Sequence, residues 1–348
     1  MSARRKLYIR PVGRLPADHG GLPALRVGGK SGPEFLAAEL IERDGGGVRR
    51  RALEGAAIRG GTPPEGTEVL LRRLSAPRSA VAGLDLGRTR LMGVVNVTPD
   101  SFSDGGRYLG AEAAVAHALQ LEAEGADILD IGGESTRPGS DPVDLEEECR
   151  RVLPVIAALA KRSKARISVD TRKAEVMRRA AAEGAHIIND VSALDHDPKA
   201  LEVVALLGLP VVLMHAQGEP RTMQVAPRYD DVVLDVYDAL EARIEACERA
   251  GIPRARLIVD PGIGFGKNLA HNLALLGSLS ILHGLGCPIL LGASRKSFIG
   301  RLTGAGAGER LPGSLAAALL GVAQGVHILR VHDVAATRQA LAVWEGAG

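Results

Sequence analysis

Charged and amide side chains stand at or beside the ends of short apolar runs along this chain, where they could form one polar binding site. Five of them are Asn96, Asp170, Asn189, Asp260 and Lys296. Each one alone could cap the helix after it or remain solvated at the surface. Carboxylates, amides and cations that converge on one mouth are costly to leave unpaired, so together they need partners or a ligand. This set therefore favours a site for a ligand with several hydrogen-bonding groups.

A second group of side chains is suited to bind an anion. Arg330 and His332 are two residues apart, and side chains of a strand project to the same side with a period of two. A guanidinium fork and an imidazole can therefore hold one anionic group together. In a parallel barrel, the loops after the last two strands are a frequent anion site.

The elements that must position these side chains form a repeating pattern from residue 91 onward. Short apolar runs alternate with amphipathic segments, as strands and helices do in βα units. One such helix begins at Asp144, which with Glu147 forms a capping-box pattern. The runs predicted as buried strands are 91–97, 127–132, 166–170, 186–191, 210–215, 256–260, 288–292 and 327–332. Eight strands alternating with helices favour an α/β fold, a (β/α)8 TIM barrel, over an open doubly wound sheet, and they place the active site at the C-terminal strand ends.

Residues 1–85 differ from the rest of the chain in charge and pattern. They hold 15 Lys and Arg against 9 Asp and Glu, whereas residues 86–348 hold 28 against 32. Glycine and proline clusters leave only residues 35–42 and 69–74 as candidate regular elements. We expect a small irregular N-terminal extension of unassigned role over 1–85 and a catalytic barrel domain over 86–348. The basic run at 49–51 is predicted to be a solvated loop rather than an anion-binding patch.

The overall composition is that of a globular protein without a nucleic-acid or membrane surface. The net charge is +2, with 46% hydrophobic and 24% charged residues. The longest mostly apolar stretch, residues 203–216, falls short of the roughly 18 residues that indicate a membrane span. The basic N-terminus lacks the apolar core of a secretory signal, and the 3 cysteines contain no CxxC pair. These features predict a cytoplasmic protein without disulfides or a structural zinc site.

The motifs at the strand ends resemble those of the dihydropteroate synthase family of pterin-binding barrels. The resemblance is carried by MGVVNVTPDSFSDGG at 92–106, DIGGESTRPG at 130–139 and RVHDV at 330–334, with the strand-end pieces between them. These motifs follow the family's order from about residue 91 to the end. The resemblance implies condensation of (7,8-dihydropterin-6-yl)methyl diphosphate with 4-aminobenzoate. The products would be 7,8-dihydropteroate and diphosphate, and the cofactor would be Mg²⁺.

The resemblance also implies a role for each matching residue. The pterin would be bound by Asp170, Asn189, Met214, Asp260 and Lys296. The diphosphate would be bound by Asn96, Thr136, Arg330 and His332, with Asn96 also a ligand of Mg²⁺. The 4-aminobenzoate would be bound by Phe102, Thr136, Arg137, Pro138, Phe265 and Ser297. Asp170, Lys296, Arg330 and His332 would be catalytic.

Two other functions compete with this interpretation. One is a related barrel that carries folate and transfers its methyl group to a corrinoid, but the chain contains no recognisable corrinoid-binding region. The other is a catalytically silent binding paralogue, which the presence of Asn96, Asp170, Lys296 and His332 disfavours. We expect two small-molecule substrates and no nucleic-acid or membrane partner. Residues 315–322 are apolar nearly all round, which suggests a helix buried against more than the barrel, and the resemblance implies a homodimer.

Overall fold

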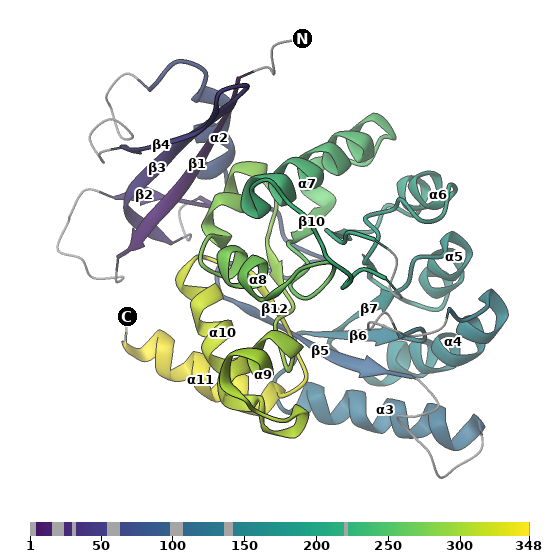
Figure 1. The fold of residues 1–348 in the computed structure, drawn as a ribbon. Coiled ribbons are helices and arrows are strands. Elements are labelled where there is room, and N and C mark those ends of the chain that lie inside the picture. The colour runs from purple at the N-terminus through teal and green to yellow at the C-terminus, as the bar shows by residue number, and fades with distance from the viewer. Residues whose placement is uncertain are drawn as a thin grey trace.

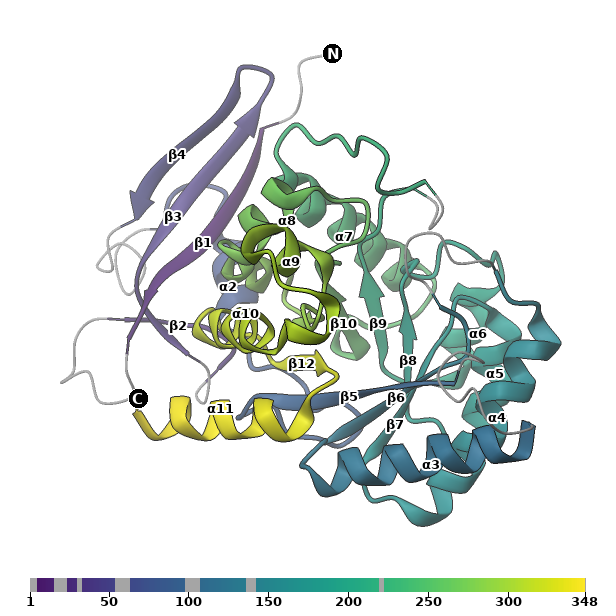
Figure 2. The ribbon, with the colours of Figure 1, turned by 60° about the horizontal axis from the view of Figure 1, so that its bottom comes forward.

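The computed structural model describes residues 5–15, 24–29, 33–53, 63–97, 107–135, 142–218 and 222–347. Within this part of the chain, a β/α barrel carries a smaller sheet-and-helix unit on one flank, as Figures 1 and 2 both show. No helix of the described residues is long and apolar enough to cross a membrane.

The barrel contains the eight strands predicted from the sequence, each within two residues of its predicted ends. They are β5 (Arg90–Asn96), β6 (Ile128–Gly132), β7 (Arg166–Asp170), β8 (Ile187–Asp190), β9 (Val211–Met214), β10 (Leu257–Asp260), β11 (Leu290–Leu291) and β12 (Ile328–Val331). All pair in parallel in the order β10-β9-β8-β7-β6-β5-β12-β11. A parallel bridge between Val259 and Ile289 joins β10 to the chain that enters β11 and closes the sheet. The predicted TIM barrel is confirmed, and the open doubly wound sheet is excluded.

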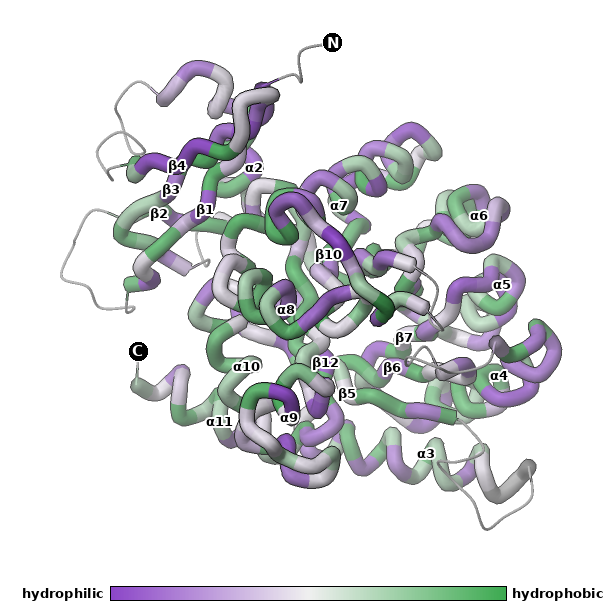
Figure 3. Tube along the Cα trace, viewed as in Figure 1, coloured by the Kyte–Doolittle hydropathy of each residue, from purple (hydrophilic) through white to green (hydrophobic). Residues whose placement is uncertain are grey.

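Helices surround the barrel and bury one face each against it. They are α3 (Arg107–Ala123), α4 (Leu145–Arg162), α5 (Ala174–Ala182), α6 (Ala200–Leu207), α7 (Val232–Arg249), α8 (Leu269–Leu276), α9 (Ser297–Thr303), α10 (Leu311–Ala323) and α11 (Val334–Ala347), with short 3₁₀ helices η2 (Arg254–Arg256), η3 (Leu279–Leu285) and η4 (Ala307–Glu309). Asp144 caps α4 as predicted, because its side chain accepts a hydrogen bond of 2.9 Å from the Glu147 amide. Hydrophobic and hydrophilic residues alternate along α4 and α7 in Figure 3.

The barrel interior changes from apolar to polar along the strands. Its lower layer consists of Met92, Ile128, Ile187, Val212, Ile258, Leu290 and Ile328, closed from below by Val81. Because strand side chains alternate, the next inward positions toward the C-terminal ends include Asp130, Asn189, Met214, Asp260 and Arg330. The apolar layer thus forms the floor on which the polar groups stand.

The N-terminal unit is regular rather than irregular, which corrects the sequence-based prediction. Four strands, β1 (Lys6–Arg14), β2 (Leu25–Arg26), β3 (Glu34–Asp44) and β4 (Gly47–Leu53), form an antiparallel sheet beside α2 (Glu68–Ser75). Its own apolar core includes Ile9, Phe35, Leu40, Leu53 and Leu74. The two elements expected at 35–42 and 69–74 are present as β3 and α2. Of the glycines at 45–47 that suggested irregular chain, Gly45 and Gly46 form the tight turn of the β3–β4 hairpin and Gly47 begins β4.

The basic run at 49–51 also differs from its prediction. It lies in β4 and not in a loop. Arg49 pairs with Glu42 on the neighbouring strand at 2.7 Å, and Arg50 pairs with Asp231 of the barrel at 2.8 Å. Arg49 thus has an acidic partner across the hairpin and Arg50 one across the interface, and all three arginines are exposed, which makes the basic run compatible with a strand here.

Candidate active site

A network of charged and amide side chains fills the C-terminal end of the barrel interior. Arg330 of β12 donates from Nε to Asp130 Oδ2 at 2.6 Å and from Nη2 to Asp170 Oδ2 at 2.8 Å. Asn189 of β8 donates from Nδ2 to the same Asp130 oxygen at 3.0 Å. Side chains from β6, β7, β8 and β12 are therefore joined across the interior.

Burial sets the charge state of this network. It raises the pKa of Asp170 to about 7, an effect that Arg330 opposes and the neighbouring Asp130 carboxylate reinforces. Asp130 itself is fully buried, and its Oδ1 has no hydrogen-bond partner among the described residues. Neither does Asp170 Oδ1 accept a hydrogen bond from this part of the chain, which leaves acceptors for a ligand that donates N–H groups.

A second cluster lies opposite, on the loops that follow β10 and β11. Lys296 Nζ donates to the Ile263 carbonyl oxygen and lies 4.5 Å from the centroid of the Phe265 ring. Burial lowers the pKa of Lys296 to about 8; Asp260 opposes this shift, and Arg330 adds to it. Burial also raises the pKa of Asp260, against the attraction of Lys296. This cluster combines a ring, a cation of reduced pKa and a buried carboxylate.

Local backbone geometry explains why the loop after β10 holds this shape. Gly262 has a φ of +65°, and a Cβ there would lie 1.9 Å from the His215 carbonyl oxygen. Its amide donates to Asp260 Oδ1 at 2.7 Å. Lys267 is 1% exposed, and its Nζ lies 2.9 Å from His215 Nδ1 and donates to the Phe265 carbonyl oxygen at 2.9 Å. The loop is thus held against the end of β9 by the close backbone approach at Gly262 and by the contacts of buried Lys267. Burial also lowers the pKa of Lys267 to about 7.

The loops after β11 and β12 are fastened to each other. His332 Nδ1 lies 3.0 Å from the Ser294 hydroxyl oxygen, which also accepts from the His332 amide at 3.2 Å. Arg295 donates from Nε to Asp333 Oδ2 at 2.9 Å. Ser297, the first residue of α9, is exposed next to Lys296. These bonds bring the predicted anion-binding residues His332 and Ser297 to one rim of the barrel.

The remaining predicted residues lie at the mouth or outside the described chain. Met214 is 4% exposed and forms part of the interior wall beside Gly262. Asn96 is half-buried at the end of β5. Four residues lie outside the described residues, so their roles stay predictions: Phe102, Thr136, Arg137 and Pro138.

Sequence reasoning assigned no role to two buried charged groups of the site, Asp130 and Lys267. Asp130 was visible as a carboxylate inside the otherwise apolar run 128–132, at an inward position of its strand. Lys267 ends the glycine-rich segment after β10. Lysine side chains are almost never fully buried unless they are paired, so its burial could not be expected from its residue type. A charged residue within an apolar strand, or at the end of a glycine-rich loop, was the feature of the sequence that could have identified each as a site residue.

Among the described residues, no group of three or more His, Cys, Asp or Glu side chains could hold a metal ion. Asn96 offers one amide oxygen at the mouth. Such a donor set suits an ion that keeps several waters and takes its other ligands from substrate phosphates, as Mg²⁺ does.

Comparison with known proteins gives one consistent result. A family model described as pterin binding enzyme matches residues 92–332. The dihydropteroate synthase of Escherichia coli (strain K12) is 53% identical over 262 residues, which cover 75% of this chain and 93% of that enzyme. The structure of Xanthomonas albilineans dihydropteroate synthase with 4-aminobenzoic acid is 56% identical, with a TM-score of 0.73 and coverage of 78% of this chain and 98% of that one. The Xanthomonas albilineans enzyme in complex with 7,8-dihydropteroate is 54% identical, with a TM-score of 0.71 and the same coverage, 78% and 98%.

Proposed function

This chain belongs to the pterin-binding enzyme family and acts as a dihydropteroate synthase, a transferase of folate biosynthesis, and from that premise we propose how its residues divide the reaction. The substrates are (7,8-dihydropterin-6-yl)methyl diphosphate and 4-aminobenzoate, and the products are 7,8-dihydropteroate and diphosphate. The observation that carries the division is the Asp130–Arg330–Asp170 network at the floor of the mouth, facing the Lys296–Phe265 cluster.

The pterin binds deepest, on the polar floor. Its edge presents alternating donors and acceptors, which need fixed carboxylates and an amide. Asp170 Oδ1, Asn189 and Asp260 supply these, and their burial makes any unpaired group costly, which selects for the matching edge. Met214 contacts the ring as an apolar wall. Lys296 donates to a ring oxygen or nitrogen once its ammonium leaves the Ile263 carbonyl.

The diphosphate binds at the rim, between the pterin and solvent. His332 and the Nη1 edge of Arg330, which donates to no other residue in the described part of the chain, contact phosphate oxygens, together with Thr136. The Asn96 amide oxygen would hold Mg²⁺ there, and the ion would supply positive charge beside the diphosphate.

The 4-aminobenzoate binds nearest the solvent. The Phe265 ring, which lies 4.5 Å from Lys296 Nζ, stacks on the benzoate. Phe102 and Pro138, outside the described residues, are predicted to contact the benzoate ring. The Ser297 hydroxyl binds its carboxylate, and we predict the same role for Arg137 and a contact with the phosphates or the aminobenzoate for Thr136, both outside the described residues.

The reaction proceeds by loss of the diphosphate before the new bond forms. The C–O bond to the diphosphate breaks, and the resulting pterin methylene cation is captured by the weakly nucleophilic aniline nitrogen, which then loses a proton. Asp170 in its ionised form stabilises the cation electrostatically, and no strong base is required. Hydrolysis of the cation competes with product formation, so water must be kept from it. We predict this role for the loops after β5 and β6, most of which lie outside the described residues.

The chain functions as a homodimer in the cytoplasm. Helix α10 buries Ala317 and Ala318 against the barrel but leaves Leu320 44% exposed, next to partly exposed Leu319. An apolar face of this kind fits a second copy of the chain. The three cysteines are buried and free, as in a reducing compartment. Sedimentation at micromolar concentration should give a dimer that Leu320→Glu converts to monomer; a wild-type monomer would contradict the proposal.

One assay tests the assignment as a whole. Purified full-length protein is supplied with both substrates and Mg²⁺, and dihydropteroate and diphosphate are measured. We expect both products in equal amounts, and loss of turnover by at least about a hundredfold in Lys296→Ala. A protein that binds the pterin but forms neither product would be a silent binding paralogue, and methyl transfer to a corrinoid would indicate the related methyltransferase.

A further inference from the structure

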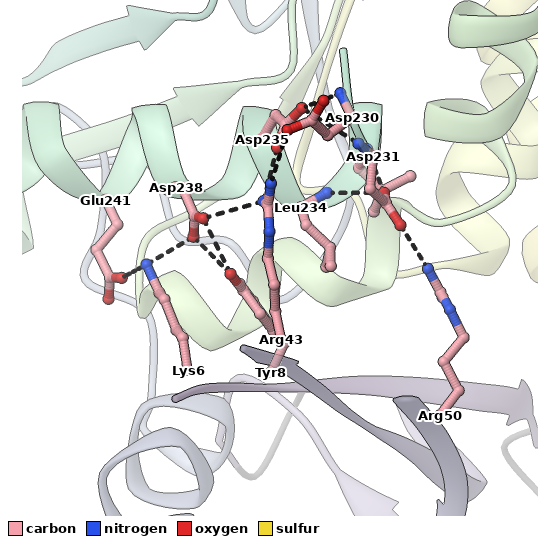
Figure 4. Close-up of polar contacts among 11 residues, drawn as sticks. Lys6, Tyr8, Arg43, Arg50, Asp230, Asp231, Leu234, Asp235, Asp238 and Glu241 are labelled. Atoms are coloured by element: carbon pink, nitrogen blue, oxygen red, sulfur yellow. Dashed lines mark hydrogen bonds and ion pairs between the residues drawn. The ribbon is translucent and has the colours of Figure 1, made fainter. Parts of the chain in front are cut away.

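The N-terminal unit is attached to the barrel by a set of ion pairs on one helix. The α7 acidic face, defined as Asp230, Asp231, Asp235, Asp238 and Glu241, presents carboxylates along α7 and the residues just before it. Cations of the N-terminal unit reach this face from β1, β3, β4 and α2, and Figure 4 shows those from the three strands. The excess of positive charge in residues 1–85 is therefore used, at least in part, to bind the barrel.

Contacts with the second half of the acidic face serve attachment. Lys6 pairs with Asp238 at 2.6 Å and with Glu241 at 2.7 Å, and Arg73 pairs with Glu241 at 2.8 Å. The Tyr8 hydroxyl donates to Asp238 at 2.9 Å, and the Tyr8 ring meets Tyr237 edge-on with centroids 5.2 Å apart. Aromatic packing and several pairs together hold the unit on the helix, although single half-exposed ion pairs contribute little.

Contacts with the first half of the face fall on the residues that build the start of α7. Asp231 caps the helix, since its side chain accepts from the Val233 and Leu234 amides. Asp235 Oδ2 accepts from the Asp230 amide at 2.9 Å. Arg43 donates to the other oxygen of Asp235 at 2.6 Å, and Arg50 donates to Asp231 at 2.8 Å. These two arginines thus hold both carboxylates that fix how the chain enters α7.

The chain that enters α7 in turn contacts the loop that carries Phe265. The Tyr229 hydroxyl donates to the Gly266 carbonyl oxygen at 2.8 Å. Gln224 Nε2 donates to the Gly264 carbonyl oxygen at 2.5 Å. Both acceptors flank Phe265, and the Tyr229 ring also lies edge-on to His271 with centroids 4.9 Å apart. The β9–α7 loop therefore supports the backbone on both sides of the proposed aminobenzoate-stacking ring.

We propose that Arg43 and Arg50 of the N-terminal unit are positioning residues for 4-aminobenzoate: they fix the start of α7, and through Tyr229 the loop that holds Phe265 against Lys296. The inference rests on the proposed role of Phe265 in aminobenzoate binding. Among the proposed pterin-binding residues, Asp170 and Asn189 bond to side chains of β12 and β6 and not to this loop. Asp260 and Lys296 do bond to the loop, at Gly262 and Ile263, on the far side of Gly264 from Phe265. We therefore expect the KM for the pterin diphosphate to change less than the KM for 4-aminobenzoate.

Two matched double variants of the full chain test the proposal. Arg43→Gln with Arg50→Gln removes the cations at the start of α7, and Lys6→Gln with Arg73→Gln removes the same number at its far half. We expect the first variant to raise the KM for 4-aminobenzoate about three- to tenfold, with kcat and the pterin diphosphate KM within about twofold of wild type. The Lys6/Arg73 variant should keep all three constants within about twofold. Arg43→Lys with Arg50→Lys should restore most of the aminobenzoate KM.

Hydrogen–deuterium exchange supplies a readout independent of turnover. Amides of residues 222–231 and 264–266 should exchange faster in the Arg43/Arg50 variant and at the wild-type rate in the Lys6/Arg73 variant. Equal changes of KM and exchange in both variants, or no change in either, would overturn the proposal. Phe265→Ala separates this failure from failure of the proposed function: an unchanged aminobenzoate KM in Phe265→Ala would refute the stacking role, whereas the exchange contrast would still test the positioning by Arg43 and Arg50.

Discussion

Arg330 connects the proposed pterin and diphosphate sites, whereas the sequence assigned it to the diphosphate alone. It is bonded to Asp130 and Asp170 in the interior while its Nη1 edge faces the proposed diphosphate site. Removal of any one member leaves a buried charge without its partner, and that cost exceeds the net contribution of the pair. The pterin floor and the diphosphate site therefore share one guanidinium.

This sharing predicts that two substitutions weaken the same ligand. Asp170→Ala and Arg330→Ala should each weaken binding of dihydropteroate, which carries no phosphate, by about 1–3 kcal/mol. From the sequence alone, the expectation is that Arg330→Ala spares dihydropteroate. His332→Ala is the matched control, because the His332 imidazole lies 3.0 Å from the Ser294 hydroxyl oxygen at the rim of the barrel; it should weaken only the diphosphate-bearing substrate. Calorimetric titration of each variant with dihydropteroate and with the diphosphate-bearing substrate distinguishes these expectations. An Arg330→Ala variant that binds dihydropteroate normally would refute the shared role.

The charge states of two buried groups predict a narrow pH optimum. Burial raises the pKa of Asp170 to about 7 and lowers that of Lys296 to about 8. Since the proposed mechanism needs ionised Asp170 and charged Lys296, kcat/KM for the pterin substrate should fall as the pH drops below about 7 and as it rises above about 8. Lys296→Arg keeps its charge, so its residual activity should lose the alkaline decrease. An alkaline decrease that persists in Lys296→Arg would assign that limb to another group.

At the scale of elements, the strands determine which side chains point into the barrel, and the loops add further residues to the site. Alternation along β6, β8, β10 and β12 turns the charged residues inward, and the loop after β10 then adds Phe265 and Lys267. The loop can approach β9 so closely because glycine occupies its tightest point. The geometry of this loop depends on the absence of a Cβ at Gly262 as much as on the residues that form hydrogen bonds.

Replacing that glycine should therefore be far more costly than replacing a glycine of similar backbone angle elsewhere. Gly262→Ala would place a Cβ 1.9 Å from the His215 carbonyl oxygen, so we expect the free energy of unfolding to fall by at least about 3 kcal/mol. Gly208, at the end of α6, has a φ of +73° and no atom within 4 Å of the place that a Cβ would occupy, so Gly208→Ala should cost only about 1–2 kcal/mol. Urea denaturation measures both, and equal losses would show that the close approach is not what requires glycine at 262.

At the scale of the whole molecule, a basic N-terminal unit sits on an acidic flank of the barrel while its connecting segment reaches beneath the barrel. Val81 closes the apolar lower layer, and Val81 and Leu84 form an isolated bridge. The site residues themselves all belong to the barrel. The unit can therefore influence the site only through the helices and loops that it contacts.

A shortened chain that begins at Ser79 tests this division. It keeps Val81 and Leu84, so the barrel should remain folded by circular dichroism with a lower thermal midpoint. We expect kcat close to that of the full chain, because the proposed catalytic residues lie after residue 90. The KM for 4-aminobenzoate should rise about three- to tenfold, because Arg43 and Arg50 are absent. A folded shortened chain without turnover would mean that the N-terminal unit completes the site itself.

The sequence by itself determined the barrel, its eight strands and most of the inward polar residues, though not Asp130, because strand and helix periodicities are local properties of the chain. Asn189, Asp260 and Lys296 could be identified as candidates from their places at strand ends. Family motifs then gave them roles. The N-terminal sheet was missed because glycines that form hairpin turns are indistinguishable, in a sequence, from glycines of irregular chain.

Only the tertiary structure decided which of these residues touch. Arg330 and Asp130 are 200 positions apart and stand on strands that are not neighbours in the sheet, yet closure of the barrel brings them within 2.6 Å. The same holds for Arg43 and Asp235, which meet only because the N-terminal unit packs on α7. Pairing of charges across an interior or an interface depends on distances that no local pattern encodes, and burial, which shifts their pKa values, exists only once the chain has closed around them.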